Sequence, residues 1–328
     1  MSDETLVEAR NLSKSFVLGQ GLLSRGRTVQ AVRDVSLGIA ESEIVGLVGE
    51  SGCGKSTFGR TLLRLIEPTS GEIHFSGRDI TKLSQRELRP LRRRMQMVFQ
   101  DPFSSLDPRM TVGALVGEAL RIHRMCPTRR EERQRVVELL EQVGLPGDCL
   151  DRFPHEFSGG QRQRVGIARA LAVEPRFIVC DEPLSALDVS IQAQIVNLLL
   201  DLQDRYGVAY LFISHDLDLV RFVSHRIAVM YLGRVVEVGE VKSVTERAVH
   251  PYTRALLGSI PIPDPGQRRS RVVLPGDVPN PSDPPVGCAL HPRCSRKIPG
   301  RCDQQTPPLV ELGDRPRHSV ACFNPCDS

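Results

Sequence analysis

A glycine-rich loop carries the clearest chemical pattern in the sequence. Residues 49–57 read Gly-Glu-Ser-Gly-Cys-Gly-Lys-Ser-Thr, which matches the phosphate-binding pattern G-x-x-x-x-G-K-[S/T]. The glycines allow backbone N–H groups to point inward, and a following helix adds its positive dipole end. Lys55 would reach the β- and γ-phosphates of a nucleotide, and Ser56 would bind Mg²⁺. An apolar run at 44–48 and a helical pattern at 56–66 flank the loop, which disfavours a glycine-rich turn without a ligand. The expected contacts are Gly49, Glu50, Ser51, Gly52, Cys53, Gly54, Lys55, Ser56 and Thr57.

Two carboxylates follow an apolar strand pattern. The run 177–180, Phe-Ile-Val-Cys, is typical of a buried strand, and Asp181 and Glu182 come directly after it. Carboxylates at the mouth of an apolar strand are costly unless a cation or a water needs them. We therefore expect Asp181 to hold the hydration shell of Mg²⁺ and Glu182 to polarise an attacking water.

Gln100 and His215 also stand just after predicted strands, at 95–99 and 209–213. The carboxyl ends of parallel strands meet at one edge of a sheet, where α/β proteins bind ligands. If the strands are parallel, both residues lie at the same edge as the two carboxylates. A lone histidine is more often structural, but at this edge His215 is a candidate contact of the γ-phosphate.

Three further positions suit a nucleotide. Ser158, Gly159, Gly160 and Gln161 open a predicted helix at 161–172, where exposed N–H groups could bind an anion; a plain capped helix is the alternative. Asp188 ends the turn Ser-Ala-Leu-Asp before a helix at 191–206. Phe16 ends the first strand and could stack on an adenine ring or be an ordinary half-buried strand residue.

These residues need an α/β scaffold. Strand patterns cover 6–16, 28–39 and 71–77, and 226–231 with 234–238 predicts a closing hairpin. Amphipathic helices at 111–124 and 128–143 form a helical insert between two parts of the α/β core. The expected fold is α/β, with a β-rich front end joined to a phosphate loop.

The composition is that of an ordinary globular protein. The chain has 328 residues, 40% hydrophobic and 25% charged, with a net charge of +4. That charge is too mild to imply nucleic acid, although it would not oppose contact with an anionic membrane surface. The first residues are acidic rather than a signal peptide, and apolar runs stay well below the roughly 20 residues that cross a bilayer, so we expect a cytoplasmic protein.

The ordered set of these motifs over roughly 200 residues resembles the nucleotide-binding subunit of an ATP-binding-cassette (ABC) transporter. The resemblance implies a P-loop NTPase fold of the ABC ATPase type, with a RecA-like core, an antiparallel β subdomain and a helical subdomain. It implies that two cassettes pair head to tail, so that Ser158, Gly159 and Gly160 serve the nucleotide of the partner.

The resemblance also implies individual roles. Phe16 would stack on adenine, residues 49–57 would hold the phosphates, and His215 would contact the γ-phosphate. Glu182 would be the general base. Mg²⁺ would be served by Ser56, Gln100 and Asp181. Gln100 and the helical insert would face the membrane subunits and couple their conformation to ATP.

Residues 100–109 and 250–257 are similar to the oligopeptide/dipeptide import ATPases. That branch implies two membrane permease subunits, an extracytoplasmic substrate-binding protein and a peripheral place on the cytoplasmic side of the inner membrane. The loop 19–27 resembles the second of two paralogous ATPases, so a heterodimer is expected, with a homodimer as the alternative. The domains would be 5–258, with the helical subdomain at about 101–160, and a Cys-rich C-terminal extension at 259–328.

Five of nine cysteines fall in this extension, which follows a proline-rich connection at 261–285. Four thiolates suit Zn²⁺ or an iron–sulfur cluster, although the lack of C-x-x-C pairs differs from common zinc ribbons; free or oxidisable thiols are a third reading. The resemblance implies a [4Fe-4S] cluster. Its ligands would be Cys288, Cys294, Cys302 and Cys322, with Cys326 unassigned and Cys53, Cys126, Cys149 and Cys180 as ordinary thiols.

Other functions remain open from the sequence. The same branch serves nickel, glutathione and other small solutes, and the ATPase subunit does not contact the cargo. A soluble cassette ATPase acting on nucleic acid or the ribosome is a remote alternative, because such chains usually hold two cassettes. A regulatory module without turnover is disfavoured by the presence of Glu182 and His215.

Overall fold

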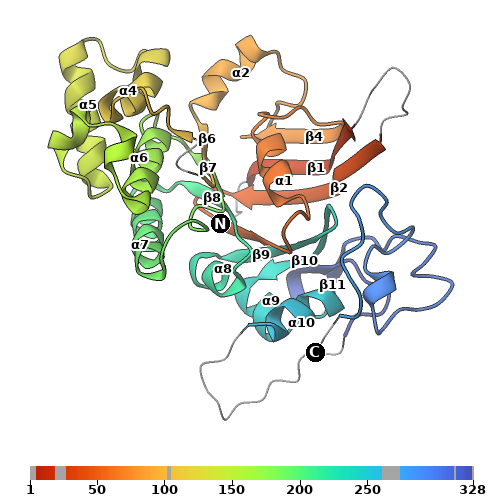
Figure 1. Cartoon of the computed structure of the whole chain (residues 1–328). Helices are drawn as coiled ribbons and strands as arrows, with labels where there is room; N and C mark the ends of the chain where they lie inside the picture. Colours follow the sequence, from red (N-terminus) through yellow and green to blue (C-terminus); the bar gives the residue numbers. More distant parts are fainter. Residues whose placement is uncertain (1–4, 19–26, 102–104, 261–273, 314, 327–328) are drawn as a thin grey trace. The chain divides into compact units, whose positions relative to one another are not determined.

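The computed structural model describes residues 5–18, 27–101, 105–260, 274–313 and 315–326. The chain divides into two compact units, which we describe separately (Figure 1). Unit one comprises Met1–Val7, Ile39–Glu43 and Ser76–Phe212, and unit two comprises Glu8–Gly38, Ile44–Phe75 and Ile213–Ser328. Nearly all of the loop 19–27, from which a paralogous partner was inferred, lies outside the described residues, as does most of the proline-rich connection.

Unit one is built on three short strands. In order across the sheet they are β8 (Ala209–Ile213), β7 (Phe177–Asp181) and β6 (Met95–Val98). The predicted parallel pairing is confirmed for β6 and β7, whose register runs from Met95 opposite Phe177 to Val98 opposite Cys180. Every residue of β7 and β8 is buried, as expected for parallel strands covered on both faces.

The helices of unit one begin at polar caps. They are α2 (Gln85–Arg92), α4 (Val112–Ile122), α5 (Arg129–Gln142), α6 (Gly159–Leu171) and α7 (Val189–Tyr206), with short turns η1 (Gly147–Asp151) and η2 (Pro154–Glu156) and a two-residue strand β5 (Arg78–Asp79). The hydroxyls of Ser84, Thr111, Thr128 and Ser158 each accept a backbone N–H of the first turn.

The two helices predicted as an insert, α4 and α5, pack against each other through apolar faces (Figure 1). The buried residues are Val112, Leu115, Val116 and Leu120 on α4 and Val136, Leu139 and Leu140 on α5. Their spacing of three and four places these residues on one side of each helix, which is the pattern that predicted the helices from the sequence.

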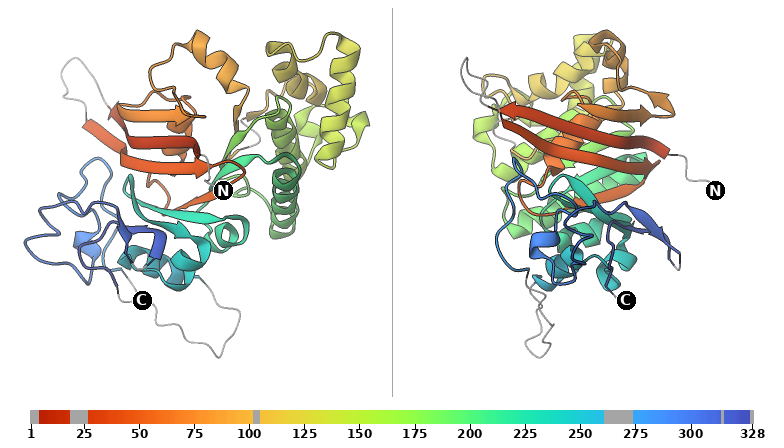
Figure 2. Two further views of the ribbon diagram at one scale, coloured as in Figure 1. Left: turned by 180° about the vertical axis from the view of Figure 1, so that it is seen from behind. Right: turned by 90° about the vertical axis from the view of Figure 1, so that its right-hand side faces the viewer.

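Unit two contains an antiparallel layer at the front of the chain. Its strands are β2 (Arg27–Ala40), β1 (Thr5–Leu18) and β4 (Ser70–Phe75), in that order, and they lie side by side in Figure 2. All three were predicted within about two residues of their ends, because alternating burial along a strand leaves a clear period of two in the sequence.

A second sheet of unit two joins the phosphate loop to the C-terminal extension. Its order is β11 (Val310–Leu312), β12 (Arg315–Val320), β10 (Arg234–Glu240), β9 (Arg226–Tyr231) and β3 (Ile44–Val48). The hairpin of β9 and β10 is confirmed, and β9 also pairs in parallel with β3. Strands β11 and β12 were not predicted, because β11 has only three residues and β12 contains a proline and polar residues instead of the apolar alternation that marks a strand.

The helices of unit two are α1 (Lys55–Leu62), α8 (Leu217–Val223), α9 (Val241–Glu246), α10 (Pro251–Gly258) and the turn η3 (His291–Arg293). Helix α1 is shorter than predicted. Arg64 adopts a left-handed φ of 54°, and the Leu65 N–H donates to the Arg60 carbonyl at 2.9 Å. This is a Schellman C-cap, formed here without the usual glycine.

Candidate nucleotide-binding site

The phosphate loop of unit two connects β3 to α1 and depends on glycine at two positions. Gly49 and Gly54 have φ of 154° and 105°. A Cβ on Gly49 would lie 2.1 Å from the Met230 carbonyl oxygen, and one on Gly54 would lie 2.0 Å from that of Ala31. The backbone of the loop therefore packs directly against the strands that carry these carbonyls. A side chain at Gly49 or Gly54 would push the loop away from them.

Lys55 lies within this loop. It is only 4% exposed, and its Nζ donates to the carbonyls of Gly49 at 2.7 Å and Glu50 at 3.2 Å. Ser56 and Thr57 follow in the first turn of α1, which Gly54 begins without a capping side chain. A helix start with a buried ammonium beside it can bind an anionic group such as a phosphate.

At the end of the strands of unit one, Gln100 and Glu182 lie together as predicted. The Gln100 Nε2 donates to the Glu182 Oε2 at 3.1 Å, and Asp181 is fully buried. Glu182 has a φ of 43°, in the left-handed region that a residue with a Cβ seldom adopts. Strain of this kind costs about 1–3 kcal/mol and is concentrated at functional sites.

The predicted anion-binding helix start is also a regular capped helix. Ser158 and Gln161 form a capping box at the start of α6, with the Ser158 N–H donating to Gln161 Oε1 at 2.9 Å. Both side chains are exposed. Gly160 packs closely, since a Cβ there would lie 2.5 Å from Ile191 Cγ2, and Asp188 precedes α7 as its N-cap.

The remaining predicted residues belong to unit two. Phe16 is half-buried near the end of β1, and the Lys14 ammonium lies 5.0 Å from its ring centroid. His215 is exposed and precedes Asp216, whose carboxylate accepts two N–H groups at the start of α8. The predicted residues are thus divided between the units, with Gln100, Ser158, Gly159, Gly160, Gln161, Asp181, Glu182 and Asp188 in unit one and Phe16, residues 49–57 and His215 in unit two.

Two contacts of the phosphate loop were missed by the sequence analysis. The Glu50 N–H donates to the Tyr252 hydroxyl at 2.9 Å, and the Glu50 carboxylate forms an ion pair with Arg293 at 3.6 Å. Tyr252 belongs to the segment 250–257, which had been noted only for its resemblance. No local pattern links Arg293, in the Cys-rich extension, to a loop near the other end of the chain.

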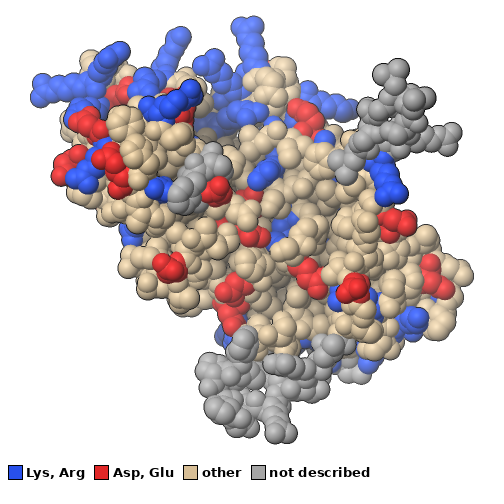
Figure 3. Space-filling view, in the orientation of Figure 1, with Lys and Arg blue, Asp and Glu red and all other residues tan. Residues whose placement is uncertain are grey.

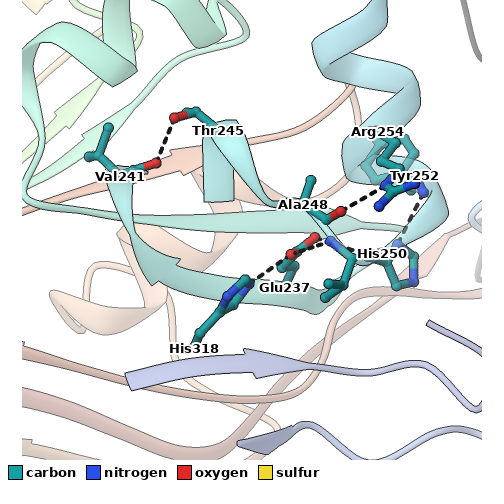
Figure 4. Close-up of polar contacts among 9 residues, drawn as sticks. Glu237, Val241, Thr245, Ala248, His250, Tyr252, Arg254 and His318 are labelled. Atoms are coloured by element: carbon teal, nitrogen blue, oxygen red, sulfur yellow. Dashed lines mark hydrogen bonds and ion pairs between the residues drawn. The ribbon is translucent and has the colours of Figure 1, made fainter. Parts of the chain in front are cut away.

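The extension is fixed to unit two by a buried carboxylate. Glu237 is fully buried, and its oxygens accept the N–H groups of Val249 and His250 at 2.9 and 3.1 Å and lie 2.8 Å from His318 Nε2 (Figure 4). His318 comes from β12, which pairs with β10. These contacts satisfy a carboxylate that would otherwise be costly to bury.

The cysteines of the extension affect one another. Burial and the charges of neighbouring thiols raise the pKa of Cys288 and Cys294, and burial raises that of Cys322 to about 12, with smaller contributions from Cys288, Cys294 and Cys302. The Cys288 N–H donates to the Cys302 carbonyl at 2.8 Å. Among the described residues, however, there is no group of three or more His, Cys, Asp or Glu side chains that could hold a metal ion. The described part of the chain therefore contains no preformed metal-binding site that would support the predicted cluster or the zinc alternative.

The thiols outside the extension match the prediction that they are ordinary. Cys53, Cys149 and Cys180 are buried and Cys126 is half-buried, and all four are unpaired as disulfides. Burial raises the pKa of each, which favours the protonated thiol over the nucleophilic thiolate at neutral pH.

Comparison with known proteins identifies the family. Residues 32–185 match the ABC transporter family, and residues 236–302 match the C-terminal region of oligopeptide/dipeptide transporters. A Brucella ovis protein, provisionally named a peptide import ATP-binding protein, is 52% identical over 98% of this chain and 99% of its own length. The oligopeptide transport ATP-binding protein AppF of Bacillus subtilis is 49% identical over 98% of each chain.

Solved structures agree with this result. The ATP-binding cassette MJ0796, determined as a dimer bound to ADP and Pi, covers 72% of this chain and 98% of its own, with 32% identity and a TM-score of 0.64. The fold and the nucleotide loop define an ABC-type ATPase. The chain belongs to the ABC transporter family, which confirms both the fold class and the resemblance inferred from the sequence.

Proposed function

We propose that this ATPase energises the import of peptides through membrane permease subunits. The proposal is supported above all by near full-length identity of about half to relatives named for peptide and oligopeptide import. The match of residues 236–302 to the C-terminal region of such transporters supports the same branch. Nickel, glutathione or another small solute is the alternative cargo, because the site described above binds nucleotide rather than cargo.

The phosphate loop and Lys55 would hold the ATP phosphates, with Phe16 against the adenine and His215 at the γ-phosphate. The loop geometry supports this role, since its glycines admit no side chain and its buried ammonium carries a positive charge. Mg²⁺ would be held by Ser56, Gln100 and Asp181 and would neutralise charge that develops on the phosphates.

Glu182 would act as the general base toward water. Its contact with Gln100 orients the carboxylate, and its left-handed backbone is the kind of strain that persists where function requires it. Asp181 lies fully buried beside it, where the charge of a bound Mg²⁺ would help to offset the cost of burying a carboxylate.

A second ABC ATPase subunit would complete each site. Ser158, Gly159, Gly160, Gln161 and Asp188 would serve the nucleotide held by the partner, and exposure of Ser158 and Gln161 at a helix N-terminus supports a role toward another chain. A paralogous partner is the first expectation and an identical one the alternative. The domain boundaries of this assembly would be 5–258, with a helical subdomain at about 101–160, and 259–328.

A peripheral place on the cytoplasmic side of the inner membrane would suit the charge of unit one. Arginines gather over helices α2, α4 and α5 (Figure 3), with exposed members Arg86, Arg89, Arg121, Arg124, Arg129, Arg130 and Arg133. Such a surface is attracted to anionic lipid. Helices within the described part of the chain are all too short or too polar to span a bilayer. Two permease subunits would therefore provide the membrane path, supplied by an extracytoplasmic substrate-binding protein, with no nucleic acid involved.

The Cys-rich extension would hold a [4Fe-4S] cluster through Cys288, Cys294, Cys302 and Cys322. Support comes from the proximity of these thiols, whose charges influence one another, although the described residues form no preformed group for a single metal ion. Zn²⁺ is the alternative. The cluster would link segments of an extension with little apolar core.

The test is uptake in cells in which the chain is replaced by its Glu182→Gln variant. We expect uptake of labelled di- and oligopeptides to fall to the level of a deletion strain, while uptake of ⁶³Ni²⁺ and glutathione is unchanged. Loss of nickel or glutathione uptake with normal peptide uptake would contradict the proposed cargo. Unchanged uptake of all three solutes would contradict a role in their import.

A further inference from the structure

A buried arginine of the Cys-rich extension reaches the phosphate loop. The Arg293 side chain is only 11% exposed, and its Nη1 lies 3.6 Å from the Glu50 Oε2. Glu50 is the first residue after Gly49, and its carbonyl accepts the Lys55 ammonium at 3.2 Å. The extension is therefore connected, through one ion pair, to the residue that holds the ammonium within the loop.

Two tyrosines surround this ion pair. The Tyr252 hydroxyl accepts the Glu50 N–H, and the Tyr252 ring lies 4.6 Å from that of Tyr231, centroid to centroid. Burial raises the pKa of Tyr231, and the neighbouring Arg293 guanidinium opposes that rise. Both tyrosines are at most 1% exposed, whereas the Glu50 side chain is 31% exposed, so the ion pair lies at the border of a region of low polarity, where unpaired charge costs more than in water.

The two atoms that form this ion pair have few other partners. Glu50 Oε2 and Arg293 Nη1 are both buried, and within the described residues neither has a hydrogen-bond partner. Their mutual ion pair at 3.6 Å is thus the main compensation for burying these two atoms. If Arg293 were removed, the half-buried Glu50 carboxylate would lose this partner and leave more negative charge beside a loop that must accept phosphate.

The position of Arg293 depends on the extension. It ends the turn η3 and lies between Cys288 and Cys294, and its Nε donates to the Pro275 carbonyl at 3.3 Å. A cavity of about 440 Å³, lined in part by Tyr231, Cys288 and Leu290, borders this segment.

We propose that Arg293 is a positioning residue for the ATP site, which neutralises Glu50 and so holds the phosphate loop ready for nucleotide. This inference rests on the proposed role of the loop in ATP binding. The C-terminal extension would then help to set the affinity for ATP, because its Arg293 pairs with Glu50 of the phosphate loop.

A double-mutant cycle on the full chain tests the proposal, with the dissociation constant of ATP measured by calorimetry at constant Mg²⁺. Arg293→Ala is expected to weaken ATP binding by about tenfold and to raise KM for ATP with little change in kcat. In a Glu50→Gln background, Arg293→Ala should change the constant by less than about twofold, since no carboxylate is left to neutralise. Arg293→Lys should recover part of the affinity, because an ammonium restores the charge.

Arg301→Ala is the matched control. The Arg301 guanidinium stacks on Phe323 within the same extension, 4.1 Å from its ring, so this variant loosens the extension while Arg293 keeps its pairing. Arg301→Ala should leave ATP affinity unchanged. If Arg293→Ala weakens ATP binding equally in the unmodified and the Glu50→Gln backgrounds, Arg293 does not act through Glu50 and the inference is overturned.

Lys55→Ala separates this inference from the proposed function. If Lys55→Ala abolishes ATP binding while Arg293→Ala binds like the unmodified protein, the inference fails and the ATP site stands. If Lys55→Ala binds ATP normally, the loop is not the ATP site and both proposals fail.

Discussion

Glu182, which we propose as the general base, has an unusual geometry. Its carboxylate is held by Gln100, and its backbone is in a conformation that glycine would adopt at lower cost. If Glu182 is the general base, the need for its carboxylate would explain why a glutamate is kept at this position. Glu174 in the same unit provides a useful comparison, since it also has a left-handed φ, of 54°, but its carboxylate pairs with surface arginines.

Glu182→Gln is therefore expected to keep ATP binding and to lower kcat by roughly 10²-fold or more, because an amide cannot accept the proton of water. ATP turnover and nucleotide affinity of the assembled dimer are the measurements. Glu174→Gln, with the same substitution at a similar backbone, should leave kcat unchanged. Near-normal turnover in Glu182→Gln would remove that residue from the role of base.

Two glycines of the phosphate loop differ in what surrounds them. Gly52→Ala should lower the free energy of unfolding by about 1 kcal/mol, because a residue with a Cβ is strained at its φ of 78°. No further cost is expected, since none of the described atoms lies within 4 Å of the added Cβ. Gly54→Ala should cost about 1–3 kcal/mol more and abolish ATP binding, because its Cβ would meet the Ala31 carbonyl at 2.0 Å. Urea denaturation and nucleotide titration of both variants measure the difference; equal effects would contradict the tight packing of Gly54.

At the level of elements, helix starts are used in two ways. Helices α2 and α6 begin with the same capping box, Ser84 with Glu87 and Ser158 with Gln161. The box satisfies backbone N–H groups in both. Only the α6 start follows the pattern Ser-Gly-Gly-Gln, in which two residues without side chains leave the helix end open to an anion.

Ser158→Ala and Ser84→Ala should each lower the free energy of unfolding by about 1 kcal/mol, since each loses one cap. Only Ser158→Ala should also reduce ATP turnover, and only in the assembled dimer, because its hydroxyl is expected to serve the partner's nucleotide. Thermal denaturation together with turnover in the monomer and dimer tests this. An equal effect of both variants on turnover would leave α6 as a plain capped helix.

The start of α10 gives unit two a dependence on pH. Its N-cap, His250, is 1% exposed, and its Nδ1 accepts the Tyr252 N–H at 3.2 Å. Burial lowers the pKa of His250 from 6.5 to about 4, although the Glu237 charge opposes this. Between these values the unfolded chain binds a proton that the folded chain does not, so stability rises with pH through this window.

As pH falls from 6.5 to 4, the His250 contribution should lower the free energy of unfolding, by on the order of 3 kcal/mol in total. The carboxylate of Glu237 and the ring of His318 face the same interior and are the same in every variant compared. His250→Asn retains a capping acceptor but cannot bind the proton, so its stability should decline less steeply over this range in urea titrations. Parallel curves for the two proteins would show that His250 is not the source.

At the scale of the whole molecule, the extension is an integral part of unit two. Strand β12 extends the sheet that contains the phosphate loop strand, and the Cys326 N–H donates to the Val249 carbonyl at 2.7 Å. A metal cluster in the extension would therefore act on a segment that is tied to the nucleotide loop through Arg293.

Protein purified without oxygen is expected to contain about four irons and matching sulfide per chain and to absorb visible light. Cys302→Ser should lose the iron and the absorption, and it should weaken ATP binding because the Arg293 segment loses its support. Cys149→Ser, at a buried thiol of unit one, should retain both. Stoichiometric zinc, or no metal in the unmodified protein, would contradict the cluster.

The sequence by itself predicted the phosphate loop, the strands that precede Gln100 and Glu182, and helices α4, α5, α6 and α7. These depend on residues that are neighbours along the chain, where periodicity, glycine and capping side chains leave a direct pattern. The sequence also predicted that Gln100 and Glu182 lie at one edge of the sheet if their strands are parallel, and the parallel pairing and the hydrogen bond between them confirm this.

Only the tertiary structure decided that β11 and β12 extend the sheet, that Glu237 is paired with His318, and that Arg293 reaches Glu50. Each of these joins segments from distant parts of the chain through buried polar groups. A buried charge must find a partner, but its own sequence neighbourhood does not specify which one. That choice follows from the packing of the whole unit.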